Sequence, residues 1–128
     1  DEFQRIEMIA ANTLYKAARQ LCADYGLWSE RAVSLMFDVK VQNGSIKSEV
    51  KELILADFQS LSHALGEEQR EVERMRIAAN RRADAAKARW REDVRARKLC
   101  IANGVGAVHG IPYDLEEQFG IGLRRVEV

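Results

Sequence analysis

The chain has 128 residues, which suits one compact domain and is too short for two ordinary ones. Twenty lysines and arginines balance twenty aspartates and glutamates, so no net charge draws the whole molecule toward nucleic acid or an anionic membrane. Apolar residues make up 47% and charged residues 31%, which excludes intrinsic disorder, and no apolar run approaches the roughly 18 residues of a membrane span. The chain opens with Asp1 and shows no signal-peptide pattern. We therefore expect a processed chain or part of a longer protein.

The first predicted helix runs from Glu2 to Tyr25, where apolar residues recur every three or four positions. Gly26 follows at the place where helices usually end. This periodicity predicts an amphipathic helix with one buried stripe. The stripe consists of Phe3, Ile6, Ala10, Leu14, Ala17 and Leu21.

Two more helices are predicted before the middle of the chain. Ser29 caps the first of them, which ends at Asn43-Gly44, and Ser45 begins the other, which ends at Gly66. The inward-facing residues of the first are Val33, Met36, Phe37 and Val41. Those of the second are Ile46, Val50, Leu53, Ile54, Phe58, Leu61 and Leu65.

The segment 67–103 begins with glutamates and ends with arginines and a lysine, the polarity that a helix dipole favours. It is long for one helix of a small domain, and the alanines between Ala83 and Ala88 offer little to bury. We therefore expect a bend or break at 83–88.

Glycines at 104, 106 and 110 mark an irregular segment with room for a short strand at Ala107-Val108. Asp114 and Glu117 have the spacing of a capping box, which predicts a last short helix ended by Gly120. The predicted fold is all-α: a single-domain bundle of about five or six helices over residues 1–128, with a short irregular Gly-rich segment near its C-terminus.

The chain offers little for metal or cofactor chemistry. Cys22 and Cys100 lie on apolar helical stretches, and we interpret them as buried free thiols, with a disulfide still open for an exported protein. There is no CxxC motif, and His63 and His109 stand alone, so we expect no metal site and no cofactor.

Between Glu71 and Lys98 there are ten lysines and arginines against five aspartates and glutamates. Most of these cations lack a carboxylate at helical spacing, so we expect several of them to pair across the fold. A basic helix can also lie along phosphates. That alternative is a small helical nucleic-acid-binding protein, which would use Arg81, Arg82, Lys87, Arg89 and the cations of 95–98.

Asp38 is the most informative single residue, because it lies between Phe37 and Val39 close to the apolar face of a predicted helix. Burying an unpaired carboxylate is costly, so a buried Asp38 requires a cation. The arginines of the 89–102 segment are the obvious supply, with Trp90 and Val94 to exclude water. We expect a structural ion pair between Asp38 and this segment. The candidate partners are Arg91 and Arg95, followed by Arg89 and Arg97.

The pattern Phe37-Asp38-x-x-Val41-Gln42-x-Gly44 resembles a segment of chitosanase-like glycoside hydrolases of the lysozyme superfamily. The basic run 90–104 is similar to a basic helix of the same group. The stretches 108–110 and 113–115 resemble the C-terminal part of phage and bacterial peptidoglycan-degrading proteins. The resemblance extends roughly from Tyr15 to Ile121. It implies a lysozyme-like helical lobe, in which the Asp at position 38 forms a buried bridge to arginines behind the active-site cleft.

The chain departs from this family in its first part. The family's general-acid glutamate ends an early helix and precedes a small β-hairpin that carries a second carboxylate, whereas one helix and a short turn precede Asp38 here. Glu2 and Glu7 lie at the extreme start without such a hairpin. We therefore expect the helical lobe without its catalytic partner. The catalytic residues are unknown, and enzymatic activity depends on a glutamate upstream of Asp1.

The first functional hypothesis is accordingly a domain related to cell-wall glycan hydrolases, acting on peptidoglycan or a chitosan-like polysaccharide. Candidate glycan-binding residues are Trp90, Tyr113 and His109. The implied partners are the cell-wall polymer, the rest of a longer chain, or a phage or secretion assembly, in an extracellular, periplasmic or virion-associated place, with a cytoplasmic one still open. A nucleic-acid partner is disfavoured and a membrane is not expected. The third hypothesis is a non-catalytic helical assembly module.

Overall fold

The computed structural model describes residues 1–43 and 45–126. Their elements, in chain order, are α1 (Glu2–Asp24), α2 (Glu30–Asn43), α3 (Ser48–Gln59), α4 (Glu67–Asp84), the 3-10 helix η1 (Ala88–Trp90), α5 (Arg91–Asn103), β1 (Val105–Val108), β2 (Ile111–Asp114) and α6 (Leu115–Phe119). The chain is 70% helical, and the predicted all-α, single-domain class is confirmed.

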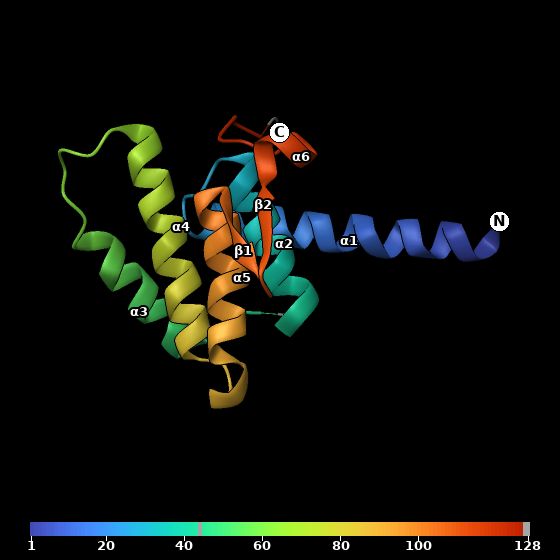
Figure 1. The fold of residues 1–128 in the computed structure, drawn as a ribbon, viewed down its shortest axis with the longest axis horizontal. Coiled ribbons are helices and arrows are strands. Elements are labelled where there is room, and N and C mark those ends of the chain that lie inside the picture. The colour runs from blue at the N-terminus through green and yellow to red at the C-terminus, as the bar shows by residue number, and fades with distance from the viewer. Residues whose placement is uncertain (44, 127–128) are drawn as a thin grey trace.

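Buried residues of α1, α2, α3, α4 and α5 form the core, with α1 packed on α2 (Figure 1). Helices α4 and α5 pack side by side, α2 lies against α5, and α3 lies against α4. Small side chains line much of this contact, since Ala78, Ala79, Ala83 and Ala102 are almost fully buried. Alanine lets two helix backbones approach closely, which brings the polar side chains of α2 and α5 within reach of each other.

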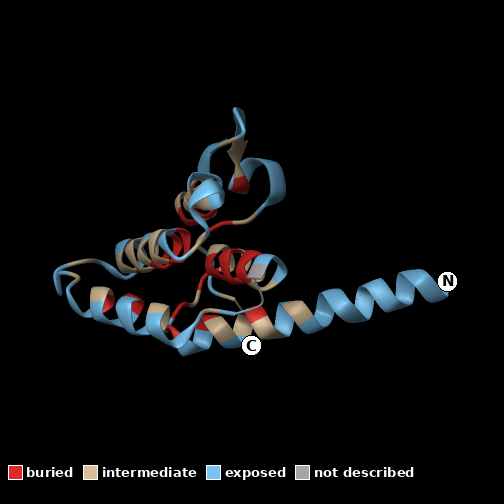
Figure 2. Ribbon diagram, turned by 90° about the horizontal axis from the view of Figure 1, so that it is seen from below, coloured by how far each residue is buried: buried red, intermediate tan, exposed pale blue. Residues whose placement is uncertain are grey.

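The predicted buried stripe of α1 is wrong in its first half. Helix α1 has the expected bounds, but residues 1–13 are all exposed and project from the body (Figure 2). Phe3 and Ile6 are 67% and 56% exposed, and burial begins only around Leu14. The 23-residue helix is longer than its 14-residue partner α2, so its first turns have no described neighbour to cover them.

The start of α2 is held by polar contacts from two distant parts of the chain. The Ser29 hydroxyl accepts a hydrogen bond from the backbone N–H of Ala32 at 3.0 Å, as the capping prediction requires. The buried carboxylate of Glu71 accepts from the backbone N–H groups of Trp28 at 3.0 Å and Ser29 at 2.8 Å. This second cap had no local signal in the sequence, because Glu71 lies on α4.

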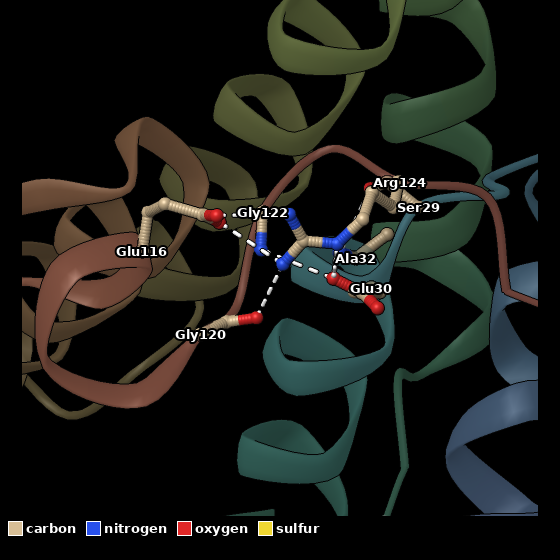
Figure 3. A network of polar contacts seen from close by, with 7 residues as sticks. All are labelled: Ser29, Glu30, Ala32, Glu116, Gly120, Gly122 and Arg124. Carbon is tan, nitrogen blue, oxygen red and sulfur yellow. Dashed lines mark hydrogen bonds and ion pairs between the residues drawn. The ribbon is translucent and has the colours of Figure 1, made fainter.

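The C-terminal segment closes over the same helix end. The backbone N–H of Val126 donates to the carbonyl of Trp28, and that of Glu30 donates to the carbonyl of Arg124. The Arg124 guanidinium lies between Glu30, Glu116 and the carbonyl of Gly120 (Figure 3). The first and last parts of the domain are therefore joined directly.

The helices of the middle of the chain follow the sequence pattern with shifted ends. α3 is shorter than predicted, since it begins at Ser48 and ends at Gln59, and turns cover the rest. The segment 67–103 breaks after Asp84, as expected from its alanines, and resumes through η1. Two predicted inward residues are exposed, Val41 by 56% and Leu53 by 46%. The predicted stop at Gly44 lies outside the described residues.

A second strand, which the sequence analysis did not predict, completes a small hairpin. β1 pairs with β2 in antiparallel fashion, with Val108 opposite Ile111. The two turn residues His109 and Gly110 both have positive φ, 52° and 76°, as a tight primed turn requires. The Asp114 side chain then accepts from the Glu117 backbone N–H at 3.1 Å and starts α6, which confirms the predicted cap.

Candidate anion-binding site

The predicted ion pair between Asp38 and the α5 segment is present. Asp38 is 6% exposed, and its two carboxylate oxygens accept hydrogen bonds from Arg97 Nε at 2.6 Å and Lys98 Nζ at 2.5 Å. Lys98 is fully buried, and its ammonium also donates to Gln42 Oε1 at 2.8 Å. Two residues of α2 thus hold one buried lysine of α5.

Of the arginines named for Asp38, Arg97 is confirmed, whereas Arg91 and Arg95, the first candidates, are wrong. The Arg91 guanidinium donates to the carbonyl of Ala86, and Arg95 bonds to Asn80 and Asp84 on α4. The rotation of α5 and the position of each residue along it decide this outcome. Positions 94, 98 and 102 face the core, which brings Lys98 to Asp38. Arg95 is turned toward α4, and Arg91 lies on the same side as Lys98 but two turns earlier, next to the loop after α4.

A pocket of about 550 Å³ opens next to this ion pair, and we call it the Arg82 pocket. One wall comes from the end of α2 and the start of α3, and the other comes from the end of α4, η1 and the first turn of α5. The lining residues are Gln42, Ser45, Ile46, Lys47, Val50, Arg82, Ala85, Ala86, Lys87, Trp90 and Val94.

Arg82 is the unusual member of the lining. Its residue is only 8% exposed, and its Nε is buried without a hydrogen-bond partner among residues 1–43 and 45–126. No carboxylate in this part of the chain forms an ion pair with it. A guanidinium stays protonated at neutral pH even though burial lowers the pKa of Arg82. The two Nη groups of Arg82 are not among the buried atoms without a partner, and no described residue bonds to them, so they are available to bind an anion in the pocket.

The charges around the pocket do not cancel. Arg82 and Lys98 contribute two buried positive charges and Asp38 contributes one buried negative charge, which leaves one positive charge in excess. Burial lowers the pKa of Lys98, the hydrogen bond and attraction of Asp38 oppose this shift, and repulsion from Arg82 and Arg97 adds to it. Lys47 and Lys87 extend the positive lining toward solvent.

Trp90 supplies an aromatic surface at the same pocket. It is 50% exposed, and the Arg89 guanidinium lies 4.9 Å from its ring centroid, so a cation covers one side of the indole. Half-exposed indoles are suited to stack on sugar rings or bases. The pocket therefore combines one buried guanidinium with an accessible aromatic ring.

The other two candidate glycan-binding residues are not in this pocket. His109 is exposed in the turn of the hairpin, and Tyr113 is half-buried on β2, and neither contributes to the lining. The structure therefore does not join Trp90, His109 and Tyr113 in one site.

The described lining contains no carboxylate and no histidine, so a pair of carboxyl groups flanking a glycosidic bond is not found there. Within the described residues, no cluster of three or more metal-ligating side chains occurs. Both cysteines are buried and free, as expected, and burial raises the pKa of Cys22 to about 12. None of the described helices combines the length and apolar character needed to cross a bilayer.

The basic stretch does not form one exposed face. Arg81 makes two hydrogen bonds to Asp57, Arg95 pairs with Asp84, Arg97 pairs with Asp38, and Lys98 is buried. The expectation that several of these cations pair across the fold is confirmed. Few cations of this stretch are therefore left unpaired to contact the phosphate backbone of a nucleic acid.

Sequence reasoning named Arg82 and Lys98 only among the cations of the nucleic-acid alternative and did not predict their burial, although a signal was present. Arg82 follows Met75 and Ala78 on the buried stripe of α4, and Lys98 lies midway between Val94 and Ala102 on that of α5. A cation in the middle of an apolar helical stripe must be buried or displaced, so each position indicated a buried charge.

Comparisons with protein-family models, curated proteins and solved structures give no match. The resemblance to the lysozyme superfamily therefore stays a prediction from the sequence.

Proposed function

We propose that this domain binds an anionic glycan of the cell-wall type, and that it is related to the helical lobe of lysozyme-superfamily hydrolases without acting as the hydrolase itself. In this proposal a carboxylate of the glycan pairs with Arg82, and a sugar ring lies against Trp90. The observation that carries it is the buried Arg82 guanidinium, which lacks a partner among the described residues and lines a pocket beside an exposed indole.

The chemistry of the pocket supports an anion. A guanidinium presents a planar fork of N–H donors that matches carboxylate and phosphate oxygens. The lysines at 47 and 87 add attraction at the mouth, and the described lining contributes no negative charge to oppose it. The apolar side chains of Ile46, Val50 and Val94 also line the pocket. They lower the local dielectric constant, which strengthens a charge-assisted hydrogen bond.

A single anionic group fits these observations better than a nucleic-acid backbone. Binding along a duplex needs a row of unpaired cations, whereas Arg81, Arg95 and Arg97 are already paired. The balanced net charge gives no long-range attraction to DNA. The experiment must therefore distinguish binding of an anionic glycan from binding of nucleic acid.

The test is co-sedimentation of the purified chain with insoluble peptidoglycan. We expect the wild type to sediment and the Arg82→Met variant to bind at least about tenfold more weakly, because a hydrogen bond to a charged group contributes about 1.5–3 kcal/mol. Trp90→Ala should also weaken binding. The matched control is Arg70→Met on the same helix, far from the pocket, which should sediment like the wild type.

Two further readouts separate this function from its rivals. Arg82→Met should not lower the melting temperature, since it removes an unpaired buried charge, so a loss of binding cannot be attributed to unfolding. Equal sedimentation of Arg82→Met and wild type, or no sedimentation of the wild type, would refute the proposal. Salt-sensitive binding of random duplex DNA by the wild type, without peptidoglycan binding, would favour nucleic acid. Clearing of a peptidoglycan suspension would contradict a purely binding role.

A further inference from the structure

The first half of α1 projects from the body and is exposed (Figure 2). It carries large apolar side chains that the described residues do not cover. Phe3, Ile6 and Ile9 are 67%, 56% and 58% exposed. The 12 consecutive exposed helical residues 2–13 carry four large apolar side chains, Met8 being the fourth, which is unusual on a protein surface and indicates an interaction site.

One face of α1 has a regular spacing. Phe3, Ile6, Ala10, Thr13 and Ala17 follow one another at steps of three and four, the spacing of a coiled-coil seam. Large side chains occupy its N-terminal part and alanines recur at 10 and 17. A seam that is large at one end and small at the other packs most closely against a helix that runs in the opposite direction.

Charge divides along the same helix. Residues 1–9 contain Asp1, Glu2 and Glu7 against Arg5, a balance of −2, whereas residues 10–20 contain Lys16 and Arg19, a balance of +2. Two copies in parallel would place like charges together, and two antiparallel copies place each acidic half beside a basic half. Helix α1 is thus complementary to itself in the antiparallel sense only.

From this geometry we propose that two copies of the chain associate through α1 in antiparallel orientation. Ile6 of one copy packs on Ala10 of the other, and Glu2 lies beside Lys16 of the second copy. Glu7 lies near its own counterpart at the two-fold axis. The only described ion pair of Glu2 is with Arg5, at 3.7 Å, and both side chains are more than 70% exposed. Such a pair contributes little to stability, so it does not prevent Glu2 from pairing with Lys16 of the second copy.

The test is the oligomeric state of the 128-residue chain by sedimentation velocity over a wide concentration range. We expect a monomer–dimer equilibrium, which Ile6→Glu weakens at least about tenfold because a charge enters the seam. The control is Met8→Glu, since Met8 is 68% exposed on the same helix but lies about 200° around its axis from Ile6. That variant should associate like the wild type.

Charge reversal tests the orientation. Glu2→Lys alone and Lys16→Glu alone should each weaken the dimer, and an equal mixture of the two should form a heterodimer tighter than either homodimer. Glu7→Gln should tighten the dimer, since it removes like charges at the axis. A wild type that stays monomeric at every concentration, equal effects of Ile6→Glu and Met8→Glu, or no gain on mixing would each overturn the proposal. Circular dichroism checks that all variants keep their helices, and none of these outcomes depends on the Arg82 pocket.

Discussion

Lys98 is the residue around which the polar interior is organised. Its ammonium is fully buried, and its two described partners, Asp38 and Gln42, both come from α2. Arg97 binds the other carboxylate oxygen of Asp38 from the half-exposed side. The carboxylate therefore neutralises one cation inside the core and one at its edge, and it joins α2 to α5 at a point where both helices are otherwise apolar.

Replacement of Asp38 should be among the most destabilising changes to this part of the protein. Asp38→Asn keeps the shape but leaves the Lys98 ammonium buried without a counterion, so we expect a loss of about 3–5 kcal/mol in the free energy of unfolding. Urea denaturation followed by circular dichroism measures it. The control is Asp84→Asn, whose carboxylate is 55% exposed beside Arg95 and should cost less than about 1 kcal/mol.

A double variant distinguishes the effect of the lost counterion from the effect of lost side-chain packing. Asp38→Leu with Lys98→Met removes the buried pair together, and it should recover most of the stability that Asp38→Asn loses, because apolar replacements of a buried pair are often neutral. A cost for Asp38→Asn similar to that of the control would contradict the assigned role.

At the scale of elements, the β-hairpin packs on α5 without a side chain to separate them. A methyl group added at Gly106 would lie 3.1 Å from the Cβ and 3.2 Å from the Cα of Cys100. Glycine is needed here for close approach of a strand to a helix, rather than for an unusual backbone angle. The Gly-rich composition that suggested irregular chain therefore has a packing function, and it holds the hairpin against the C-terminal half of α5.

Gly106→Ala should displace β1 from α5 and cost about 1–3 kcal/mol, the range of overpacking in a close contact. Thermal or urea unfolding measures the cost. Gly66→Ala serves as the comparison, because its added methyl group would meet only the Gln69 side chain at 3.8 Å, and alanine at this N-cap of α4 should cost no more than about 1 kcal/mol. Equal stability of the two variants would show that the hairpin is not held by this contact.

At the scale of the whole molecule, distant parts of the chain meet at the start of α2. The C-terminal segment bonds to the residues that start α2, and Glu71 from the middle of the chain caps the same helix end. α5 in turn packs on both α2 and α4. The core combines residues of both halves of the sequence, from Ala18 to Ala102, which favours a single cooperative unit.

We therefore expect two-state unfolding in which reporters at different places agree. Trp28→Phe leaves only Trp90, beside the pocket, and Trp90→Phe leaves only Trp28, at the start of α2. The fluorescence midpoint of each variant in urea should coincide with its own helical transition by circular dichroism. A Trp90 transition at clearly lower urea would show that the pocket end opens before the rest.

Local signals in the sequence determined the class of fold and most helix ends. Ser29 and Asp114 mark caps through contacts that span three residues, and the alanines near Ala83 mark a break, so neighbouring residues alone carry this information. The requirement that a buried Asp38 have a cation from the 89–102 segment was also predictable, since it follows from the cost of an unpaired charge.

Only the tertiary structure decided which cation that is and which apolar face stays uncovered. The rotation of α5 and its position along α2 bring Arg97 and Lys98, rather than Arg91 and Arg95, to Asp38, and both depend on how Val94 and Ala102 pack against distant helices. The same holds for α1, whose periodicity predicts an apolar stripe but not the length of its neighbour. Helical periodicity is a property of a few adjacent residues, whereas burial depends on what the rest of the chain brings to that surface.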